Sequence, residues 1–255
     1  MTISPETLLG DIPLRRMGLG TNRLTNTPEN AAFLREAVEA GINMVDTAHV
    51  YKRGESEAAI GSALSPVPEG CVVATKGGFD SGRPDVLRQQ IEESLRRLRT
   101  DRIGLYYLHR VDPETPLEES LATIEDFRRA GSVGHVGLSN VSVEQIERAR
   151  AVTPIAAVQN HFNLSERQHD QVVDYCSQEG IVFVPYFPLR GEARPEVPEI
   201  AKRHGATPAQ AILAWLLRRS RAMLPIPGSL SIDHVTENLA ALELELTDAE
   251  FETLA

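Results

Sequence analysis

The feature that most constrains the fold is an alternation of short apolar runs with amphipathic stretches of helical length. This order is typical of an α/β protein in which crossover helices join the strands of a parallel sheet. Eight runs qualify as strands: LRRMGLG, NMVDTA, CVVATK, IGLYYLH, HVGLSN, AAVQN, IVFVPYF and AMLPIP. Eight such units in 255 residues predict a closed (β/α)8 TIM barrel, with an open doubly wound sheet as the alternative.

Helix boundaries follow from proline and glycine positions. Thr27-Pro28 and Thr207-Pro208 each place an N-cap residue before a first-turn proline, and Thr115-Pro116 is expected to open a further helix that Gly131 closes. Residues 1 to 14 are too short for a domain and are expected to cap the barrel bottom. We therefore predict one domain over residues 1–255, with its core at about 14–251.

Composition excludes several classes of protein. The chain has 36 acidic and 26 basic residues, a net charge of −10, which disfavours nucleic acid and membrane surfaces as partners. No apolar run approaches the ~20 residues of a membrane-spanning helix, and the N-terminus lacks the pattern of a signal peptide. Cys71 and Cys176 are isolated, so a cytoplasmic protein without disulfides is expected.

Common cofactor and catalytic motifs are absent. GLGTNR has Arg23 where a dinucleotide-binding fingerprint needs its third glycine, which disfavours a Rossmann phosphate loop. The chain has no GxxxxGK[ST], HExxH or GxSxG sequence, and its histidines lack metal-ligand spacing. No metal site is predicted.

Polar residues follow several of the predicted strands. Asp46 ends NMV, Tyr51 lies in the following loop, Lys76 ends CVVAT, and His109 ends LYYL. Further polar or aromatic residues in such places are Ser139, Asn140, Gln159, Asn160 and Tyr186. Active sites of (β/α)8 barrels lie at the carboxyl ends of the strands, so we expect these side chains to converge there.

These residues carry a family resemblance. GINMVDTAHVYKRGESEAAIGSAL, TKGG and LYYLHR resemble the catalytic segments of the aldo-keto reductase superfamily. The similarity continues through VGLSN, VQNHFN, VPYFPL and IPGSLSIDHVTENLAAL, from about Leu14 to about Phe251. The trimmed segment after Tyr186 is typical of a bacterial-type, short-loop member. The resemblance implies an NAD(P)H-dependent oxidoreductase that reduces an aldehyde or ketone to an alcohol by hydride transfer.

The resemblance also implies a catalytic tetrad of Asp46, Tyr51, Lys76 and His109. Tyr51 would be the general acid. Because a free tyrosine has a pKa near ~10, the neighbouring Lys76 cation would assist proton donation, and Asp46 would hold Lys76 charged. His109 would orient the carbonyl oxygen and share the proton transfer.

Cofactor contacts are implied by the same resemblance. The matching residues are Gly20, Thr21, Asp46, Ser139, Asn140, Gln159, Tyr186, Pro188, Leu189, Gly228, Ser229, His234, Glu237 and Asn238. Ser229 is expected to begin a helix whose N-terminal amides face phosphate. Many relatives have Lys and Arg near the 2′-phosphate where this chain has Gly228 and His234, which bind phosphate less firmly. NADPH is expected, with NADH as the alternative.

The substrate is expected to be a small-molecule carbonyl compound, and the protein a monomer. Asn22, His49, Tyr51 and His109 would line the pocket, with Asn22 in place of a tryptophan found in many relatives. Phe79 fits either a pocket or a plain loop, whereas Trp215 is expected in the core. Two other functions remain open: a lyase that uses Lys76 covalently, and a slow regulatory protein that keeps the cofactor.

Overall fold

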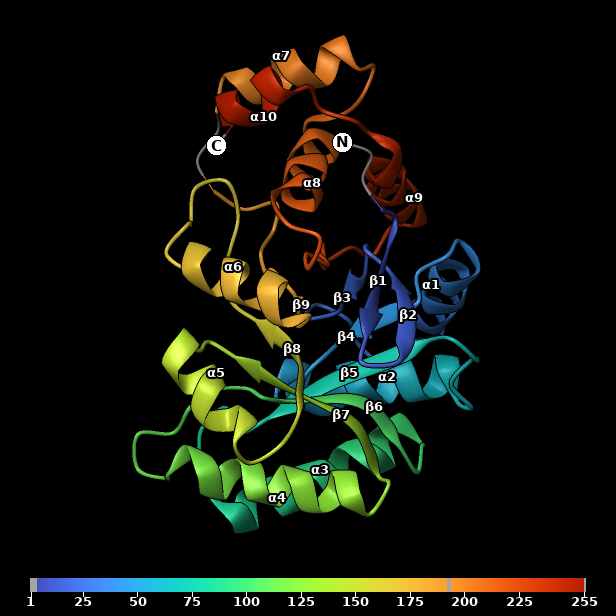
Figure 1. Cartoon of the computed structure of the whole chain (residues 1–255). Helices are drawn as coiled ribbons and strands as arrows, with labels where there is room; N and C mark the ends of the chain where they lie inside the picture. Colours follow the sequence, from blue (N-terminus) through green and yellow to red (C-terminus); the bar gives the residue numbers. More distant parts are fainter. Residues whose placement is uncertain (1–3, 192–193, 255) are drawn as a thin grey trace.

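The computed structural model describes residues 4–191 and 194–254, so residues 1–3, 192–193 and 255 of the predicted domain lie outside it. One parallel sheet curls around the centre of the molecule (Figure 1). Its strands are adjacent in chain order: β3 (Leu19–Gly20), β4 (Met44–Asp46), β5 (Val72–Gly77), β6 (Ile103–Leu108), β7 (Val133–Ser139), β8 (Ile155–Gln159) and β9 (Val182–Phe183).

The eighth predicted strand, residues 222–227, closes the barrel between β9 and β3. Leu224 N–H donates to the Phe183 carbonyl at 2.9 Å, and Gly18 N–H donates to the Pro225 carbonyl at 2.9 Å. Pro225 and Pro227 have no N–H to donate toward β3, so the segment forms isolated bridges rather than a continuous strand. The TIM barrel is confirmed, and the open sheet is excluded.

Arg16 holds this seam together. Its buried guanidinium donates to the Met223 carbonyl at 3.0 Å and to the Leu217 carbonyl at 2.6 Å, and it also contacts the Ser220 carbonyl. Burial, and then the charge of Arg221, lowers the pKa of Arg16 to about 10, so the group stays charged at neutral pH. A cation at the carboxyl end of a helix satisfies carbonyls that have no partner within the helix.

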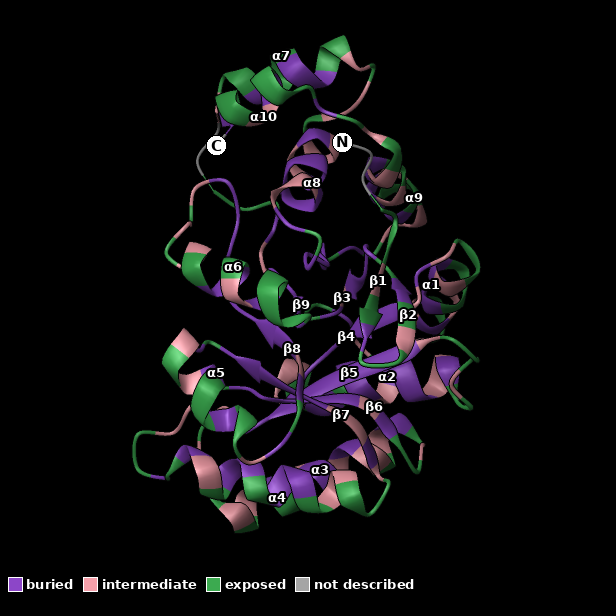
Figure 2. Ribbon diagram, viewed as in Figure 1, coloured by how far each residue is buried: buried purple, intermediate pink, exposed green. Residues whose placement is uncertain are grey.

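Most helices cover the sheet and bury one face, whereas α8 is buried on nearly all sides and α7 and α10 pack against it (Figure 2). They are α1 (Pro28–Glu39), α2 (Glu55–Leu64), α3 (Pro84–Leu98), α4 (Leu117–Arg129), α5 (Val143–Arg150), α6 (Asp170–Glu179), α7 (Glu196–Arg203), α8 (Pro208–Arg219), α9 (Ile232–Ala240) and α10 (Asp248–Leu254). The described residues also form two single-turn helices, η1 (Tyr51–Gly54) and η2 (Ala241–Glu243). None of the helices in the described ranges has the length and apolar content needed to cross a membrane.

Of the helix starts predicted at Thr27, Thr207 and Thr115, the first two are right. Thr27 and Thr207 are N-caps whose hydroxyls accept hydrogen bonds from helical N–H groups. Thr115 does not cap α4, because its hydroxyl donates to Asp112 at 3.0 Å and the helix begins two residues later, at Leu117.

An antiparallel hairpin of β1 (Glu6–Leu9) and β2 (Ile12–Arg15) covers the bottom of the barrel (Figure 1). Leu9 and Leu14 are fully buried and pack with Met44 and Val72, the first residues of β4 and β5. The predicted cap is therefore confirmed for the part of residues 1–14 that the structure describes.

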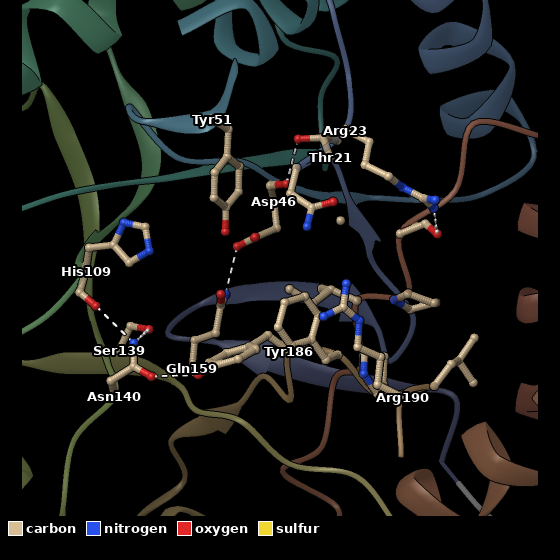
Figure 3. Close-up of a pocket in the computed structure, with 18 of the residues that line it drawn as sticks. Thr21, Arg23, Asp46, Tyr51, His109, Ser139, Asn140, Gln159, Tyr186 and Arg190 are labelled. Carbon is tan, nitrogen blue, oxygen red and sulfur yellow. Dashed lines mark hydrogen bonds between the residues drawn. The ribbon is translucent and has the colours of Figure 1, made fainter. Parts of the chain in front are cut away.

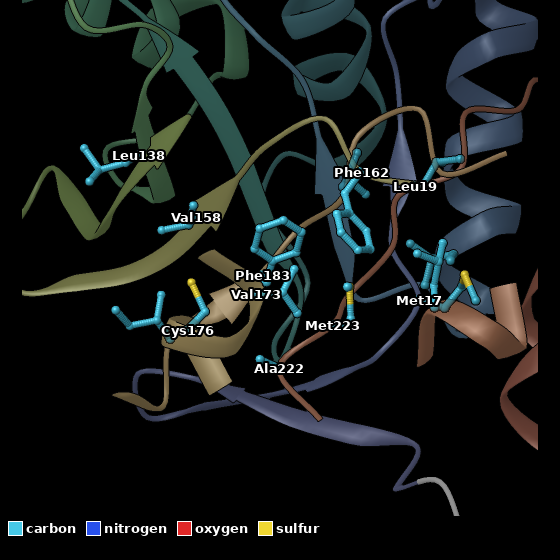
Figure 4. Close-up of a cluster of buried hydrophobic side chains, with 14 of the residues drawn as sticks. Met17, Leu19, Leu138, Val158, Phe162, Val173, Cys176, Phe183, Ala222 and Met223 are labelled. Atoms are coloured by element: carbon cyan, nitrogen blue, oxygen red, sulfur yellow. The ribbon is translucent and has the colours of Figure 1, made fainter. Parts of the chain in front are cut away.

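Side chains of the barrel strands alternate between two apolar cores. One set fills the barrel interior: Met44, Val72, Ala74, Leu105, Tyr107, Ala157, Val182, Val184, Leu224 and Ile226. The intervening residues face the helices, where Phe162, Phe183 and Met223 belong to the larger outer core (Figure 4). Trp215 of α8 is fully buried in that outer core, as predicted, and it stacks on Phe162.

This alternation places the polar strand ends inside the barrel. Two residues beyond Met44 lies Asp46, two beyond Ala74 lies Lys76, and two beyond Tyr107 lies His109. Since side chains along a strand alternate with a period of two, each of these follows an inward apolar residue on the same face. Interior packing thus aims them at the carboxyl end of the barrel.

Candidate active site

A cavity of about 510 Å³ opens at the carboxyl ends of the strands (Figure 3), a size typical of small-molecule sites. Thirteen of the predicted site residues line it: Gly20, Thr21, Asn22, Asp46, Tyr51, His109, Ser139, Asn140, Gln159, Tyr186, Pro188, Leu189 and Gly228. The convergence expected of polar residues at the strand ends is therefore present.

A buried ion pair forms the floor of this cavity. Lys76 Nζ donates to Asp46 Oδ1 at 2.6 Å and to the Thr47 carbonyl at 2.6 Å, and both side chains are almost fully buried. Gln159 Nε2 donates to the second carboxylate oxygen of Asp46 at 2.8 Å. Each charge thus has its partner and further hydrogen bonds, which a buried pair requires.

The pair keeps Lys76 charged. Burial alone lowers the pKa of Lys76, but the Asp46 carboxylate and then the Tyr51 hydroxyl raise it above its usual value. Burial raises the pKa of Asp46, while Lys76 and Gln159 act in the opposite direction. With a carboxylate oxygen 2.6 Å away, the proton stays on the amine, and an ammonium ion lies beneath the cavity.

Tyr51 is held over this ammonium by the sharp turn that begins η1. Lys76 Nζ lies 5.1 Å from the centroid of the Tyr51 ring, and the ring meets His109 edge-on at 6.1 Å between centroids. The following residues Lys52 and Arg53 adopt left-handed backbone conformations, with φ of 49° and 57°. Such conformations are unfavourable for these residues and persist only where surrounding contacts enforce them.

Those contacts come from α2 and α3. Glu57 is fully buried and accepts hydrogen bonds from Thr75 at 2.7 Å and from Arg97 at 3.2 Å. Arg97 also donates to the carbonyl of His49 at 3.3 Å, two residues before Tyr51. The prediction that His49 lines the pocket is wrong, because its imidazole turns away and hydrogen-bonds Glu93 at 2.8 Å.

His109 is neutral at physiological pH. Burial, and then the positive charges of Lys76 and Arg110, lowers its pKa to about 3. Its ring lies edge-on to Phe79, with 4.9 Å between centroids, and Phe79 lines the cavity rather than serving as a plain loop residue. A neutral imidazole can donate one hydrogen bond but carries no labile second proton.

Amide and aromatic groups form the opposite wall. Tyr186 donates from its hydroxyl to Asn140 Oδ1 at 2.8 Å, and Asn140 Nδ2 donates to the His109 carbonyl at 3.2 Å. His161 stacks on Tyr186 with 5.2 Å between centroids and an interplanar angle of 5°, which orients that ring. Asn140 has φ of 59°, a left-handed conformation that asparagine tolerates better than most residues.

Four predicted cofactor residues do not line this cavity: Ser229, His234, Glu237 and Asn238. The prediction that Ser229 begins a helix is wrong, because α9 begins at Ile232 with Ser231 as its N-cap. Ser229 instead accepts a hydrogen bond from the Ser231 N–H at 3.0 Å. Glu237 accepts one from the Thr207 hydroxyl at 2.5 Å, which ties α9 to the start of α8.

Sequence reasoning missed several lining residues. Three are arginines, Arg23, Arg110 and Arg190, and the others are Phe187, Ile226 and Pro227. Arg23 donates to the Gly228 carbonyl at 3.0 Å, on the side of the cavity opposite His109 (Figure 3). Ile226 could have been predicted from the sequence as a lining residue, because it faces inward on the eighth strand and lies two residues before the predicted site residue Gly228. Nothing in the sequence distinguishes the arginines from other charged loop residues.

Comparison with known proteins gives a consistent result. The model of the Aldo/keto reductase family matches residues 16–255. An uncharacterized oxidoreductase of Schizosaccharomyces pombe is 36% identical over 268 residues, covering 96% of this chain and 87% of the relative. Pyridoxine 4-dehydrogenase of Escherichia coli is 33% identical over 273 residues, 96% of each chain. The crystal structure of an aldo-keto reductase from Klebsiella pneumoniae with NADPH superposes with a TM-score of 0.89 at 28% identity, covering 100% of this chain and 94% of that one.

The low pKa of His109 predicts an acid-sensitive fold. A histidine in an unfolded chain has a pKa near ~6.5, so below that pH His109 binds a proton in the unfolded chain but not in the folded chain. The folded state is therefore fully stable with respect to His109 above pH ~6.5, and it loses stability progressively as the pH falls toward about 3. At pH ~4.5 the loss is about 3 kcal/mol, from ~1.4 kcal/mol per pH unit.

The measurement is urea unfolding at pH 7.5 and 4.5, followed by Trp215 fluorescence. His109→Gln should lose about 3 kcal/mol less between the two pH values than the unmodified chain. The control is His234→Gln, on the exposed face of α9, which should lose as much as the unmodified chain. Equal losses in all three proteins would show that His109 is not held neutral.

Proposed function

The chain belongs to the aldo/keto reductase family of oxidoreductases, and from this premise we propose that it reduces an aldehyde or ketone to an alcohol with NADPH. The observation that carries the proposal is the buried Asp46–Lys76 pair, which holds an ammonium ion beside the hydroxyl of Tyr51. The substrate would be a small carbonyl compound, and residues 1–255 would act as one domain.

Tyr51 would be the general acid. Reduction of a carbonyl leaves an alkoxide that needs a proton, and the Tyr51 hydroxyl is the acidic group that reaches the cavity from beside His109. The Lys76 ammonium would stabilise the phenolate that remains after the proton leaves. Lys76 does not itself line the cavity, so it would act through Tyr51.

His109 would orient the substrate and not protonate it. A histidine with a pKa of about 3 is neutral at pH 7 and donates a single hydrogen bond. Aimed at the carbonyl oxygen, that bond would position the substrate and stabilise the developing negative charge. The sequence-based hypothesis also assigned His109 a share in the proton transfer; the role proposed here is orientation of the carbonyl oxygen alone.

The cavity suits a dinucleotide cofactor. A Cβ at Gly20 would lie 2.8 Å from the Ile226 carbonyl, so glycine lets the backbone of β3 approach the eighth strand closely beside Gly228, where both glycines line the cavity. Asn140 and Gln159 present amide groups for a carboxamide, Tyr186 offers an aromatic face, and Arg23 supplies positive charge for phosphate. A bound reduced nicotinamide would supply the hydride to the carbonyl carbon.

NADPH is proposed ahead of NADH because the Klebsiella pneumoniae structure contains NADPH. By the family resemblance, Gly228 and His234 would stand where many relatives have Lys and Arg near the 2′-phosphate. His234 is exposed in the first turn of α9, where a helix N-terminus adds favourable dipole for an anion. Because neither Gly228 nor His234 offers the guanidinium or ammonium group of those relatives, we propose that the chain binds the 2′-phosphate weakly and keeps some activity with NADH.

The geometry favours the reductase over a lyase. A Schiff-base lysine needs a neutral amine that a substrate can reach. Lys76 is about 1% exposed, engaged by Asp46 and the Thr47 carbonyl, and held charged. These features support an electrostatic role for Lys76.

Removal of the Tyr51 hydroxyl tests the proposal. Tyr51→Phe keeps the ring and its packing against His109 but removes the proton donor, so kcat for aldehyde reduction should fall by about 10²–10⁴-fold. NADPH affinity, measured by fluorescence titration, should change less than about threefold, because the cofactor contacts are retained. A variant that keeps full kcat would overturn the assignment of Tyr51.

His234→Arg tests the placement of the 2′-phosphate. A guanidinium binds phosphate in a bidentate way, so KM for NADPH should fall by about three- to tenfold while KM for NADH stays within about twofold. His234→Gln is the uncharged control and should leave the ratio of the two KM values unchanged. Equal effects of His234→Arg on both cofactors would place the 2′-phosphate elsewhere.

A further inference from the structure

Three arginines line a cavity in a protein of net charge −10. Among the described residues, Asp46 is the only carboxylate in the lining, and Lys76 already neutralises it. The cavity is therefore positive although the molecule as a whole is negative. Such local reversal attracts anions to this site, and the remaining surface repels them.

Arg110 lies at the substrate end of the cavity, directly after His109. Its guanidinium carbon is 3.9 Å from the centroid of the Phe79 ring, and that ring packs against His109. Burial, Lys76 and then Arg110 lower the pKa of His109, whereas burial raises the pKa of Tyr186 and the charge of Arg110 opposes that rise, so Arg110 acts on both rings. Arg23, by contrast, lies across the cavity against Gly228 (Figure 3).

Arg110 lacks a carboxylate partner within residues 4–191 and 194–254. Among the described residues the other two cavity arginines, Arg23 and Arg190, also lack one, whereas Arg83 pairs with Asp85 and Arg148 with Glu118 on the outer surface, each at 2.9 Å. The Phe79 ring fixes the position of the Arg110 guanidinium without neutralising its charge. The structure thus holds a cation in place against Phe79, which packs on His109, and leaves its charge available.

We propose that Arg110 binds the carboxylate of the substrate, and that the preferred substrates are aldehydes or ketones that also carry a carboxylate. This inference rests on the proposed function and names the substrate class of the same site. Arginine suits the role because its planar donors match the two oxygens of a carboxylate. Its place next to His109 requires the carboxylate to lie only a few bonds from the carbonyl group.

The experiment compares charged substrates with neutral substrates of nearly the same shape. The 2-, 3- and 4-carboxybenzaldehydes are each paired with their methyl esters, and kcat/KM is measured with saturating NADPH. The variants are Arg110→Gln, which removes the charge, Arg110→Lys, which retains it, and Arg23→Gln, which removes a charge at the other end of the cavity.

We expect at least one acid to exceed its ester by about tenfold or more in kcat/KM, mainly through KM. Arg110→Gln should abolish that preference and change the ester by less than about twofold. Arg110→Lys should restore part of the preference, and Arg23→Gln should leave the acid-to-ester ratio unchanged.

Two results would overturn the inference. One is the absence of an acid preference for all three isomers. The other is an Arg110→Gln effect that falls equally on acid and ester, or on KM for NADPH alone, which would assign Arg110 to His109 or to the cofactor. If neither acids nor esters consume NADPH, the proposed function itself fails, and the two failures are therefore distinguishable.

Discussion

The structure of the site depends on one buried ion pair. Moving Lys76 and Asp46 out of water costs several kcal/mol per ion, and the pair is tolerable only because Thr47 and Gln159 satisfy the remaining hydrogen-bonding groups. This constraint fixes the relative positions of β4, β5 and β8 at the carboxyl end of the barrel. Tyr51 above the pair thereby has a cation beside its hydroxyl, and the chemistry proposed for the chain follows from that placement.

Much of this arrangement could be predicted from the sequence because barrel strands alternate with a period of two. An inward apolar residue such as Ala74 or Tyr107 predicts that the second residue after it also faces inward. Lys76 and His109 are therefore placed by packing before any chemistry is considered. The helix caps at Thr27 and Thr207 were predictable for a similar reason, since their hydrogen bonds are local in sequence.

The errors occur where side-chain direction depends on distant contacts. His49 follows a strand as Tyr51 does, but Glu93 of α3 draws its imidazole out of the cavity. The eighth strand is interrupted because Pro225 and Pro227 lack N–H groups, and α9 starts three residues after Ser229. Arg110 was missed because its partner is the face of Phe79, a residue from another loop. The local sequence pattern does not show which distant residues will be in contact.

The proposed reaction requires the cavity to hold a reduced nicotinamide and a carbonyl compound together while Tyr51 supplies the proton. The most direct measurement uses NADPH deuterated at both C4 positions of the nicotinamide ring, an aromatic aldehyde, and mass spectrometry of the alcohol. We expect one deuterium on the former carbonyl carbon in every product molecule. An alcohol without deuterium, or an adduct on Lys76 trapped by borohydride, would contradict it.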